Sequence, residues 1–156
     1  MPSIDTDSLP RQVGASYPAP FDEPCLHRVR RRLGDAGGLT DFGVNLLELP
    51  PGAWSSQRHW HSAEDEFVWV LEGEVILIDD AGEHVLRAGD CATFPKGDAN
   101  GHHLVNRSDS QVRCLEVGSR KPGEDDCDYP DIDLHLGPGR SSGYAHNDGT
   151  PYPPRR

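Results

Sequence analysis

The stretch from Gly52 to Gly73, GAWSSQRHWHSAEDEFVWVLEG, constrains the fold of this chain more than any other. His59 and His61 are two residues apart, and on a β-strand this spacing places both imidazoles on one face, because side chains alternate. Glu66 then begins a strongly apolar run that Gly73 ends. Two imidazoles and a carboxylate from a neighbouring strand make up most of a site for a first-row metal ion. The stretch therefore predicts neighbouring strands that carry a metal site.

A second stretch, from Gly89 to Asn106, reads GDCATFPKGDANGHHLVN. It contains a glycine-led turn, a short strand-like segment, the turn Pro95-Lys96-Gly97 and then His102. Together, the two stretches resemble the two sequence motifs of the cupin superfamily, which are glycine, HxH, glutamate, glycine and then glycine, PxG, histidine, asparagine. The resemblance implies an all-β fold of the cupin type, a double-stranded β-helix or jelly-roll barrel, here with extended N- and C-terminal arms.

The spacing departs from the family pattern in both motifs. In the first, six residues separate the glycine from the first histidine, where the family more often has five. In the second, four residues separate Gly97 from His102, where the family usually has two, and Asn100 stands at the usual spacing. Extra length in a loop costs little free energy. His102 keeps the usual spacing to Asn106, so the resemblance assigns the fourth ligand to His102. The alternative is His103, although one step along a strand would turn it to the opposite face.

The resemblance thus implies one divalent ion held by four side chains, His59, His61, Glu66 and His102. Fe, Mn, Ni, Co and Zn all stay open as the ion, because imidazole and carboxylate ligands suit each of them. An octahedral ion bound by these four groups keeps two positions for water, dioxygen or a chelating substrate. No organic cofactor is expected. Val68 and Val70 are expected to line the rest of the pocket.

The sequence leaves the general acid or base open among Gln57, His103 and Glu48. Gln57 shares the predicted strand face of the HxH histidines, where it could fix an imidazole or hold substrate. Glu48 and Glu116 lie on predicted flanking strands, and the pattern does not decide which face either of them occupies.

Three functions stay open, because cupins as a family include all three. The first is a metal-dependent enzyme that isomerises, epimerises or eliminates a small oxygenated molecule, such as a sugar, a sugar acid or a keto or hydroxy acid. The second is an Fe-dependent dioxygenase. The third is a non-catalytic module that binds or senses a small molecule. Each of these implies a small-molecule ligand or substrate.

Charge argues against other classes of partner. The chain has 156 residues, enough for one domain with a core, and a formal net charge of −11. Nucleic acids and anionic membranes are therefore not expected as partners, because phosphate contacts dominate such binding. The dense basic run from Arg28 to Arg32 is expected to pair with acidic neighbours or to lie along a strand edge.

No apolar segment is long enough to span a bilayer, and the first ten residues lack a secretory signal, so a cytoplasmic location is expected. The four cysteines show no CxxC spacing and are predicted to be free thiols. Cys91 and Cys114 fall in predicted strands, where they are expected to be buried as small apolar residues.

Short apolar segments between Gly, Pro and Asp turns predict the strands 26–33, 39–49, 54–61, 66–72, 74–78, 83–87, 91–94, 102–106 and 111–117. No useful length has helical periodicity. The expected organisation is an N-terminal arm (1–25), a cupin barrel (26–118) and a C-terminal tail (119–156) that packs on the barrel or on a partner subunit. Aromatic and aliphatic residues in the Pro- and Gly-rich tail are not typical of a disordered segment.

The predicted strand 66–72 is apolar on both faces. Val68 and Val70 share a face with Glu66, whereas Phe67 and Trp69 point the opposite way. The second face must be covered by the chain's own N-terminal arm or by another subunit. A homodimer is the expected assembly, because closed two-fold symmetry is the commonest solution.

Overall fold

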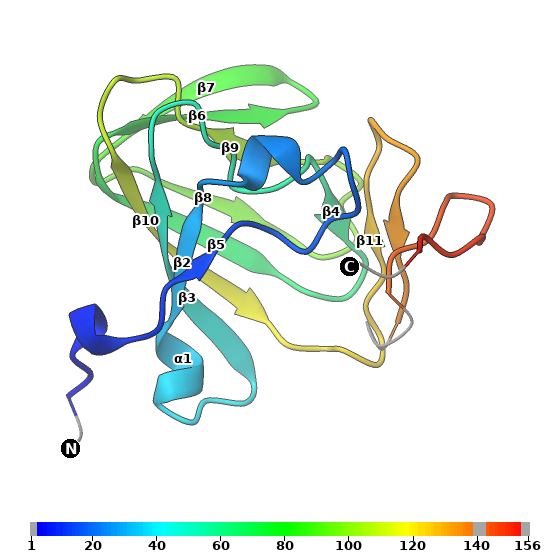
Figure 1. Cartoon of the computed structure of the whole chain (residues 1–156), viewed down its shortest axis with the longest axis horizontal. Coiled ribbons are helices and arrows are strands. Elements are labelled where there is room, and N and C mark those ends of the chain that lie inside the picture. The colour runs from blue at the N-terminus through cyan, green and yellow to red at the C-terminus, as the bar shows by residue number, and fades with distance from the viewer. Residues whose placement is uncertain (1–2, 139–142, 154–156) are drawn as a thin grey trace.

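The structure, a computed structural model, describes residues 3–138 and 143–153, and these are built mainly from antiparallel strands (Figure 1). The strands are β1 (Gln12–Val13), β2 (Val29–Arg32), β3 (Phe42–Leu49), β4 (Trp60–His61), β5 (Glu66–Glu72), β6 (Glu74–Asp79), β7 (Gly82–Arg87), β8 (Cys91–Phe94), β9 (His103–Val105), β10 (Val112–Ser119), β11 (Cys127–Asp128) and β12 (His135–Leu136). The described residues also form the short helix α1 (Leu33–Ala36) and 3-10 turns at Thr6–Ser8 and Glu23–Cys25. The predicted all-β fold is confirmed.

Two sheets enclose the main core. The larger has the strand order β1-β2-β3-β10-β5-β8, and the smaller has the order β7-β6-β9. Leu47, Val70 and Cys114 of the larger sheet pack in one cluster with Val75 and Leu104 of the smaller. The first four of these side chains are fully buried. A third sheet, β12-β11-β4, joins the tail to the strand that carries His61.

The register of the larger sheet decides which side chains enter the barrel. Glu116 of β10 lies opposite Asn45 of β3 and Val68 of β5. Residues directly opposite each other on antiparallel strands share a face. Because Val70 and Cys114 are fully buried on that same face, it is the inner one. The inner face therefore brings polar side chains into the barrel beside apolar ones.

Gly73 makes the tight connection between β5 and β6. Its φ is +84°, a conformation that side chains of L-residues rarely adopt. A Cβ atom there would also lie 3.0 Å from the carbonyl oxygen of Gln111. The glycine that ends the apolar run is thus required by both the turn and the neighbouring strand.

The terminal segments pack together in a second apolar cluster, which contains side chains from both ends of the chain. The ring of Tyr17 lies 5.7 Å from that of Tyr129 and 5.5 Å from that of Tyr144, and Phe21 lies 6.1 Å from Tyr152. Residues 1–2 of the predicted arm, and residues 139–142 and 154–156 of the predicted tail, fall outside the described residues. In the described part, the tail lies against the chain's own N-terminal segment and β4 (Figure 1).

The predicted strand 54–61 is wrong over most of its length. Only Trp60–His61 form a strand, while Trp54 and His59 make isolated bridges with Val105 and His102. Part of the reason is a long-range contact, because the hydroxyl of Ser55 accepts a hydrogen bond from the backbone of Leu104 and competes with regular strand pairing. The strict alternation expected for this segment does not hold.

The outer face of β5 is uncovered in the single chain. Trp69 and Leu71 are 45% and 47% exposed, so the described N-terminal residues do not cover them. Cys91 was expected to be buried but is exposed, because it lies opposite Trp69 on the same outward face of β8, an edge strand. Cys114 is buried as expected, and all four cysteines are free.

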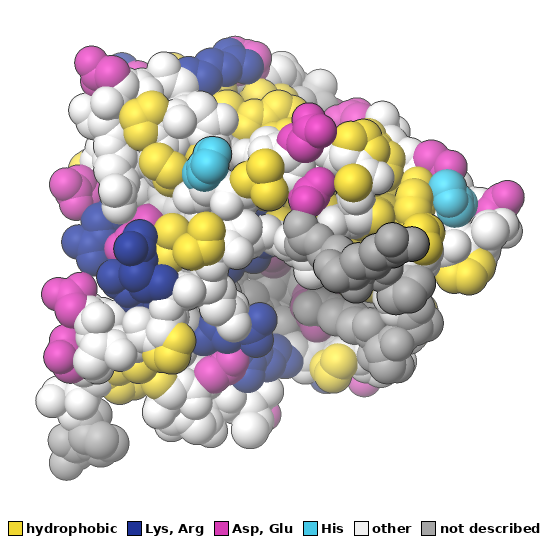
Figure 2. Space-filling view, viewed as in Figure 1, with side chains coloured by type: hydrophobic (Ala, Val, Ile, Leu, Met, Phe, Trp, Pro, Cys, Tyr) yellow, Lys and Arg dark blue, Asp and Glu magenta, His cyan; other side chains and the backbone are white. Residues whose placement is uncertain are grey.

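The basic run on β2 pairs with acidic neighbours, as predicted. Arg30 lies 2.7 Å from Glu116, and Arg31 lies 2.7 Å from Glu48. Basic and acidic side chains also lie next to each other on the face shown in Figure 2. No helix within the described residues is long and apolar enough to cross a membrane.

Candidate metal centre

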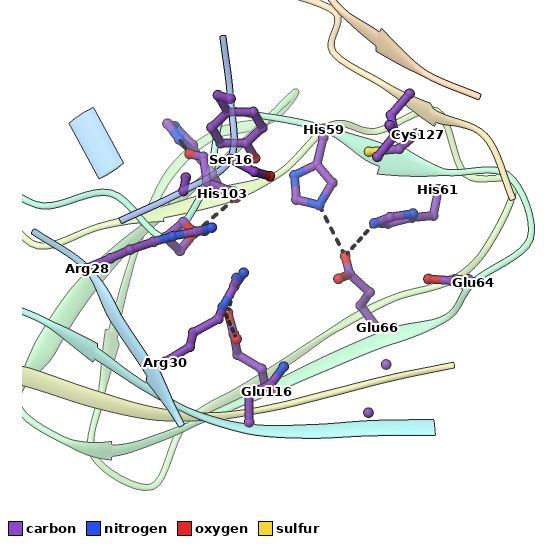
Figure 3. Close-up of a pocket in the computed structure, with 18 of the residues that line it drawn as sticks. Ser16, Arg28, Arg30, His59, His61, Glu64, Glu66, His103, Glu116 and Cys127 are labelled. Atoms are coloured by element: carbon purple, nitrogen blue, oxygen red, sulfur yellow. Dashed lines mark hydrogen bonds and ion pairs between the residues drawn. The ribbon is translucent and has the colours of Figure 1, made fainter. Parts of the chain in front are cut away.

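The carboxylate of Glu66 is the meeting point of the side chains predicted as ligands. Its Oε2 atom lies 2.9 Å from Nε2 of His102. The same atom lies 3.6 Å from Nε2 of His59 and 3.7 Å from Nε2 of His61 (Figure 3). Glu66 starts β5 and His61 lies on β4. His59 and His102 are held side by side by paired backbone hydrogen bonds of 3.2 and 2.9 Å. The fold thus brings these four side chains together from two separate stretches of sequence.

His59 and His61 are oriented by contacts of Nδ1, the ring nitrogen that does not face Glu66. Nδ1 of His59 lies 2.9 Å from the carbonyl oxygen of Gln57, and Nδ1 of His61 lies 2.7 Å from the carboxylate of Asp125. With an ion bound, the proton of each ring would stay on the Nδ1 that faces an acceptor, which leaves Nε2 available to the ion. The ring of His102 stacks on Phe94, with centroids 3.5 Å apart and planes 1° from parallel.

The charges at this point suit a cation. Burial alone would raise the pKa of Glu66, but hydrogen bonds from His102 and His59 outweigh burial and lower it well below its ordinary value. Burial lowers the pKa of His102, although its hydrogen bond with Glu66 opposes this shift. A carboxylate that stays ionised in a buried position is ready to bind a cation, because a carboxylate ligand must be deprotonated.

The donor set therefore fits a divalent ion. One donor atom each from His59, Glu66 and His102 lies within 4.8 Å of the others, and Nε2 of His61 faces the same carboxylate. Imidazole nitrogen and carboxylate oxygen suit several first-row ions, so the geometry does not select one of them.

The tail contributes three side chains to this region that were not predicted from the sequence. Asp125 is 1% exposed, and besides His61 it accepts a hydrogen bond from the backbone of Ala63. Cys127 comes within 4.8 Å of donor atoms of His59 and His61, and the ring of Tyr129 stacks on His59 at 5.9 Å. Their alternate spacing was the one available signal, but it lies in an acidic segment that resembles a solvated tail.

A cavity of about 1040 Å³ adjoins these side chains, and Figure 3 shows some of the residues that line it. Val68 and Phe94 supply part of its apolar wall. Val70, which was expected there, lies instead in the main core. The cavity therefore combines the histidine and glutamate side chains with an apolar surface.

Alternate residues Arg28, Arg30 and Arg32 bring guanidinium groups to the same cavity. Arg30 is held by two hydrogen bonds to Glu116, of 2.7 and 2.8 Å. Arg28 is 7% exposed, and its hydrogen bonds within the described residues go to the carbonyl oxygens of Gly14 and Ser55. Carbonyl oxygens satisfy its donors but do not neutralise its charge, so Arg28 is a buried cation at the cavity wall.

The three candidates for a general acid or base do not converge on the centre. The side chain of Gln57 donates to the carbonyl oxygen of Phe21, and Glu48 is buried in an ion pair with Arg31 on the outward face. Neither lines the cavity. His103 does line it, but its Nδ1 lies 3.1 Å from the carbonyl oxygen of Ser56 and its ring packs edge-on against Trp54.

Comparison with known proteins identifies the family to which the chain belongs. The cupin domain family matches residues 45–118. A crystal structure of a sugar phosphate isomerase from a cupin superfamily, from Silicibacter pomeroyi, is 47% identical, with a TM-score of 0.90 and 97% of each chain covered. A protein from Acidithiobacillus ferrooxidans, named only provisionally as a sugar phosphate isomerase, is 29% identical, with a TM-score of 0.72 and coverage of 83% of this chain and 82% of that one.

A predicted oxalate decarboxylase from Thermotoga maritima shares the fold at 18% identity, with a TM-score of 0.61 and coverage of 75% of this chain and 97% of that one. A search of curated proteins found no match to the chain. The identity and coverage of the Silicibacter pomeroyi structure, together with the matching domain and the barrel, establish the family. The chain belongs to the cupin superfamily.

Proposed function

We propose that this protein is a metal-dependent cupin isomerase whose substrate is a phosphorylated sugar. The observation that carries the proposal is the pairing, in one cavity, of the His59, His61, Glu66 and His102 donors with the buried cation Arg28. A sugar phosphate offers matching groups, vicinal oxygens that can chelate a metal and a phosphate dianion. The 47% identity to a cupin described as a sugar phosphate isomerase supports the same substrate class.

His59, His61, Glu66 and His102 would hold one divalent ion in this enzyme. When bound, such an ion polarises a carbonyl or hydroxyl oxygen and so makes the neighbouring C–H more acidic. Asp125 keeps His61 in the tautomer that a ligand needs, and the backbone carbonyl of Gln57 does the same for His59.

Arg28 would anchor the phosphate. Its guanidinium is fixed by two backbone carbonyl oxygens, so little side-chain entropy is lost when it meets a ligand. Arg30 is already neutralised by Glu116 and is expected to contribute less. Val68 and Phe94 line the cavity, and their apolar side chains would exclude water and so strengthen both electrostatic contacts.

The test begins with the metal content of protein purified without an affinity tag. Apo-protein is then loaded with Fe, Mn, Co, Ni or Zn and incubated in ²H₂O with a panel of aldose and ketose phosphates, with and without oxygen. Proton NMR should show interconversion of one aldose–ketose pair, which stops when a chelator removes the ion. Product formed only with oxygen would instead indicate a dioxygenase, and tight binding without turnover would indicate a binding module.

The phosphate anchor is tested separately by calorimetry. The sugar phosphate that reacts should bind more tightly than the same sugar without phosphate, and Arg28→Ala should abolish most of the difference. Arg87→Ala is the matched control, because Arg87 is a surface arginine on β7 paired with Glu74. Melting temperatures of both variants show whether the loss comes from unfolding. Equal affinity of the wild type for both ligands would contradict the anchor.

A further inference from the structure

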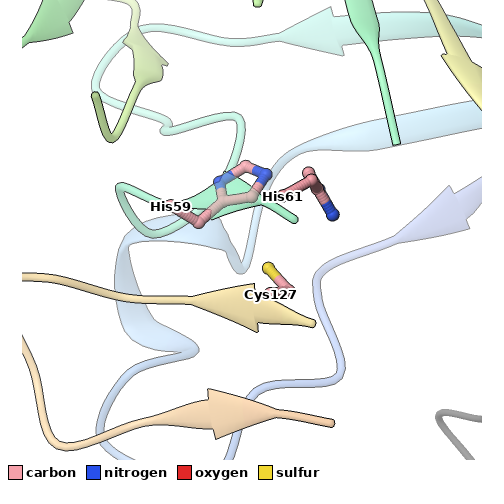
Figure 4. A group of neighbouring side chains, drawn as sticks. All are labelled: His59, His61 and Cys127. Carbon is pink, nitrogen blue, oxygen red and sulfur yellow. The ribbon is translucent and has the colours of Figure 1, made fainter. Parts of the chain in front are cut away.

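Cys127 provides a sulfur donor beside the histidines of the metal centre. It begins β11 directly opposite His61 in the strand register, and it is 3% exposed. Its Sγ and one ring nitrogen from each of His59 and His61 all lie within 4.8 Å of one another (Figure 4). This spacing allows one ion to contact all three side chains.

The nitrogens available to this group are the same ones that face Glu66. Nδ1 of His59 is occupied by the Gln57 carbonyl, and Nδ1 of His61 is occupied by Asp125, so each ring has only Nε2 left for an ion. His59 is also common to the group formed with Glu66 and His102. An ion that uses Cys127 and an ion that uses Glu66 would therefore compete for the same nitrogens.

The two groups differ in one donor, which is the soft sulfur of Cys127 in one group and the hard carboxylate oxygen of Glu66 in the other. Thiolate sulfur favours soft ions such as Cd²⁺ and also suits Zn²⁺, whereas carboxylate oxygen favours hard ions such as Mn²⁺. The side chains of Cys127 and Tyr129 are both buried. Both residues lie in the second apolar cluster and not in solvent.

We propose that His59, His61 and Cys127 form a second, thiolate-containing site for a thiophilic divalent ion, which excludes the ion bound through Glu66. A hard ion is held by the histidines and Glu66. A soft ion is held by the histidines and Cys127 on β11, and it makes no contact with Glu66. The inference rests on the metal site of the proposed function, and it makes thiophilic ions inhibitors of that function.

The experiment uses the full chain and four forms of it, the wild type, Cys127→Ser, Glu66→Gln and Cys91→Ser. Cys91→Ser is the matched control, because Cys91 is exposed on β8, away from the centre. Equilibrium dialysis gives the affinity and stoichiometry for Mn²⁺ and Cd²⁺, and ultraviolet absorption reports a thiolate-to-cadmium charge-transfer band.

In the wild type, one ion of either kind should bind per chain, and Cd²⁺ should displace Mn²⁺. Cys127→Ser should lose the charge-transfer band and roughly tenfold or more of its Cd²⁺ affinity while it keeps its Mn²⁺ affinity. Glu66→Gln should show the opposite pattern, and Cys91→Ser should match the wild type.

Cd²⁺ bound by the wild type without a Cys127-dependent charge-transfer band would overturn the second site. So would simultaneous binding of one Mn²⁺ and one Cd²⁺ per chain, because it would show that the sites do not compete. Either result would leave the Glu66 site and the proposed isomerase intact if Mn²⁺ binding is lost in Glu66→Gln. Failure of the wild type to bind any ion would refute both proposals.

Discussion

The carboxylate of Asp125 lies 2.7 Å from Nδ1 of His61, although the two residues are 64 positions apart in the chain. Asp125 is almost completely buried, and its second oxygen accepts a hydrogen bond from the backbone of Ala63. The segment after β10 is therefore part of the candidate metal centre, and it is not merely appended to the barrel. A carboxylate behind a histidine fixes the tautomer of the ring and increases its basicity as a ligand.

Replacement of Asp125 should weaken metal binding without removing a ligand. Asp125→Asn is expected to lower metal affinity about 10- to 100-fold, the usual effect of losing such a partner. Competition with a chromophoric chelator measures the change. Glu124→Gln is the matched control, because Glu124 is an exposed neighbour. Unchanged affinity in Asp125→Asn would show that the contact with His61 does not tune the site.

Substitution of the adjacent histidines should separate metal binding from packing. His102→Ala should lose most of the metal, because Nε2 of His102 faces Glu66 at 2.9 Å. His103→Ala should keep the metal but lower the free energy of unfolding of the apo-protein by about 1–3 kcal/mol, since its buried ring packs on Trp54 at 4.6 Å. Metal analysis and urea unfolding provide the two readouts. Loss of metal in His103→Ala alone would reverse the assignment of the fourth ligand.

Binding of the ion should stabilise the fold. An ion present at 100 times its dissociation constant adds about 2.7 kcal/mol to the free energy of unfolding, provided that it does not bind the unfolded chain. The melting temperature of the wild type should therefore rise on addition of the ion and fall again with a chelator. In His59→Ala and His61→Ala most of this rise should be absent. A full rise in these variants would place the ion elsewhere.

The uncovered face of β5 should form a homodimer. Trp69 and Leu71 are exposed there, and Cys91 lies opposite Trp69 on the neighbouring strand. Sedimentation should show a dimer at micromolar concentration that Trp69→Glu converts to a monomer. The rate at which Cys91 reacts with a thiol reagent should also fall as protein concentration rises. A wild type that remains a monomer, with concentration-independent labelling, would refute the interface.

All four cysteines should titrate as thiols. They are free in the structure, and Cys25, Cys114 and Cys127 are buried. Protein prepared with oxidation excluded should give four equivalents with a thiol reagent in denaturant without prior reduction. A shortfall of two equivalents would reveal a native disulfide.

The sequence by itself determined the fold class and most of the centre. Strand 66–72 was predicted with the bounds that β5 has, because a short apolar run ended by a glycine is a local signal of a buried strand. The HxH pair, Glu66 and His102 were named from motif spacing, and the structure brings the four side chains together. Gly73 was predicted to end the apolar run, and in the structure it lies between β5 and β6 with a positive φ that suits glycine.

Only the tertiary structure decided what surrounds these residues. Gln57 was expected beside the histidines, but hydrogen bonding of Ser55 to Leu104 replaces regular strand pairing in that segment, and Gln57 turns towards Phe21. Arg28 lies at the cavity wall, and Asp125 and Cys127 lie beside the histidines. Strand pairing and burial between segments far apart in the chain place them there. Periodicity reports only neighbours along the chain, so contacts between residues 60 or more positions apart leave no pattern in the sequence.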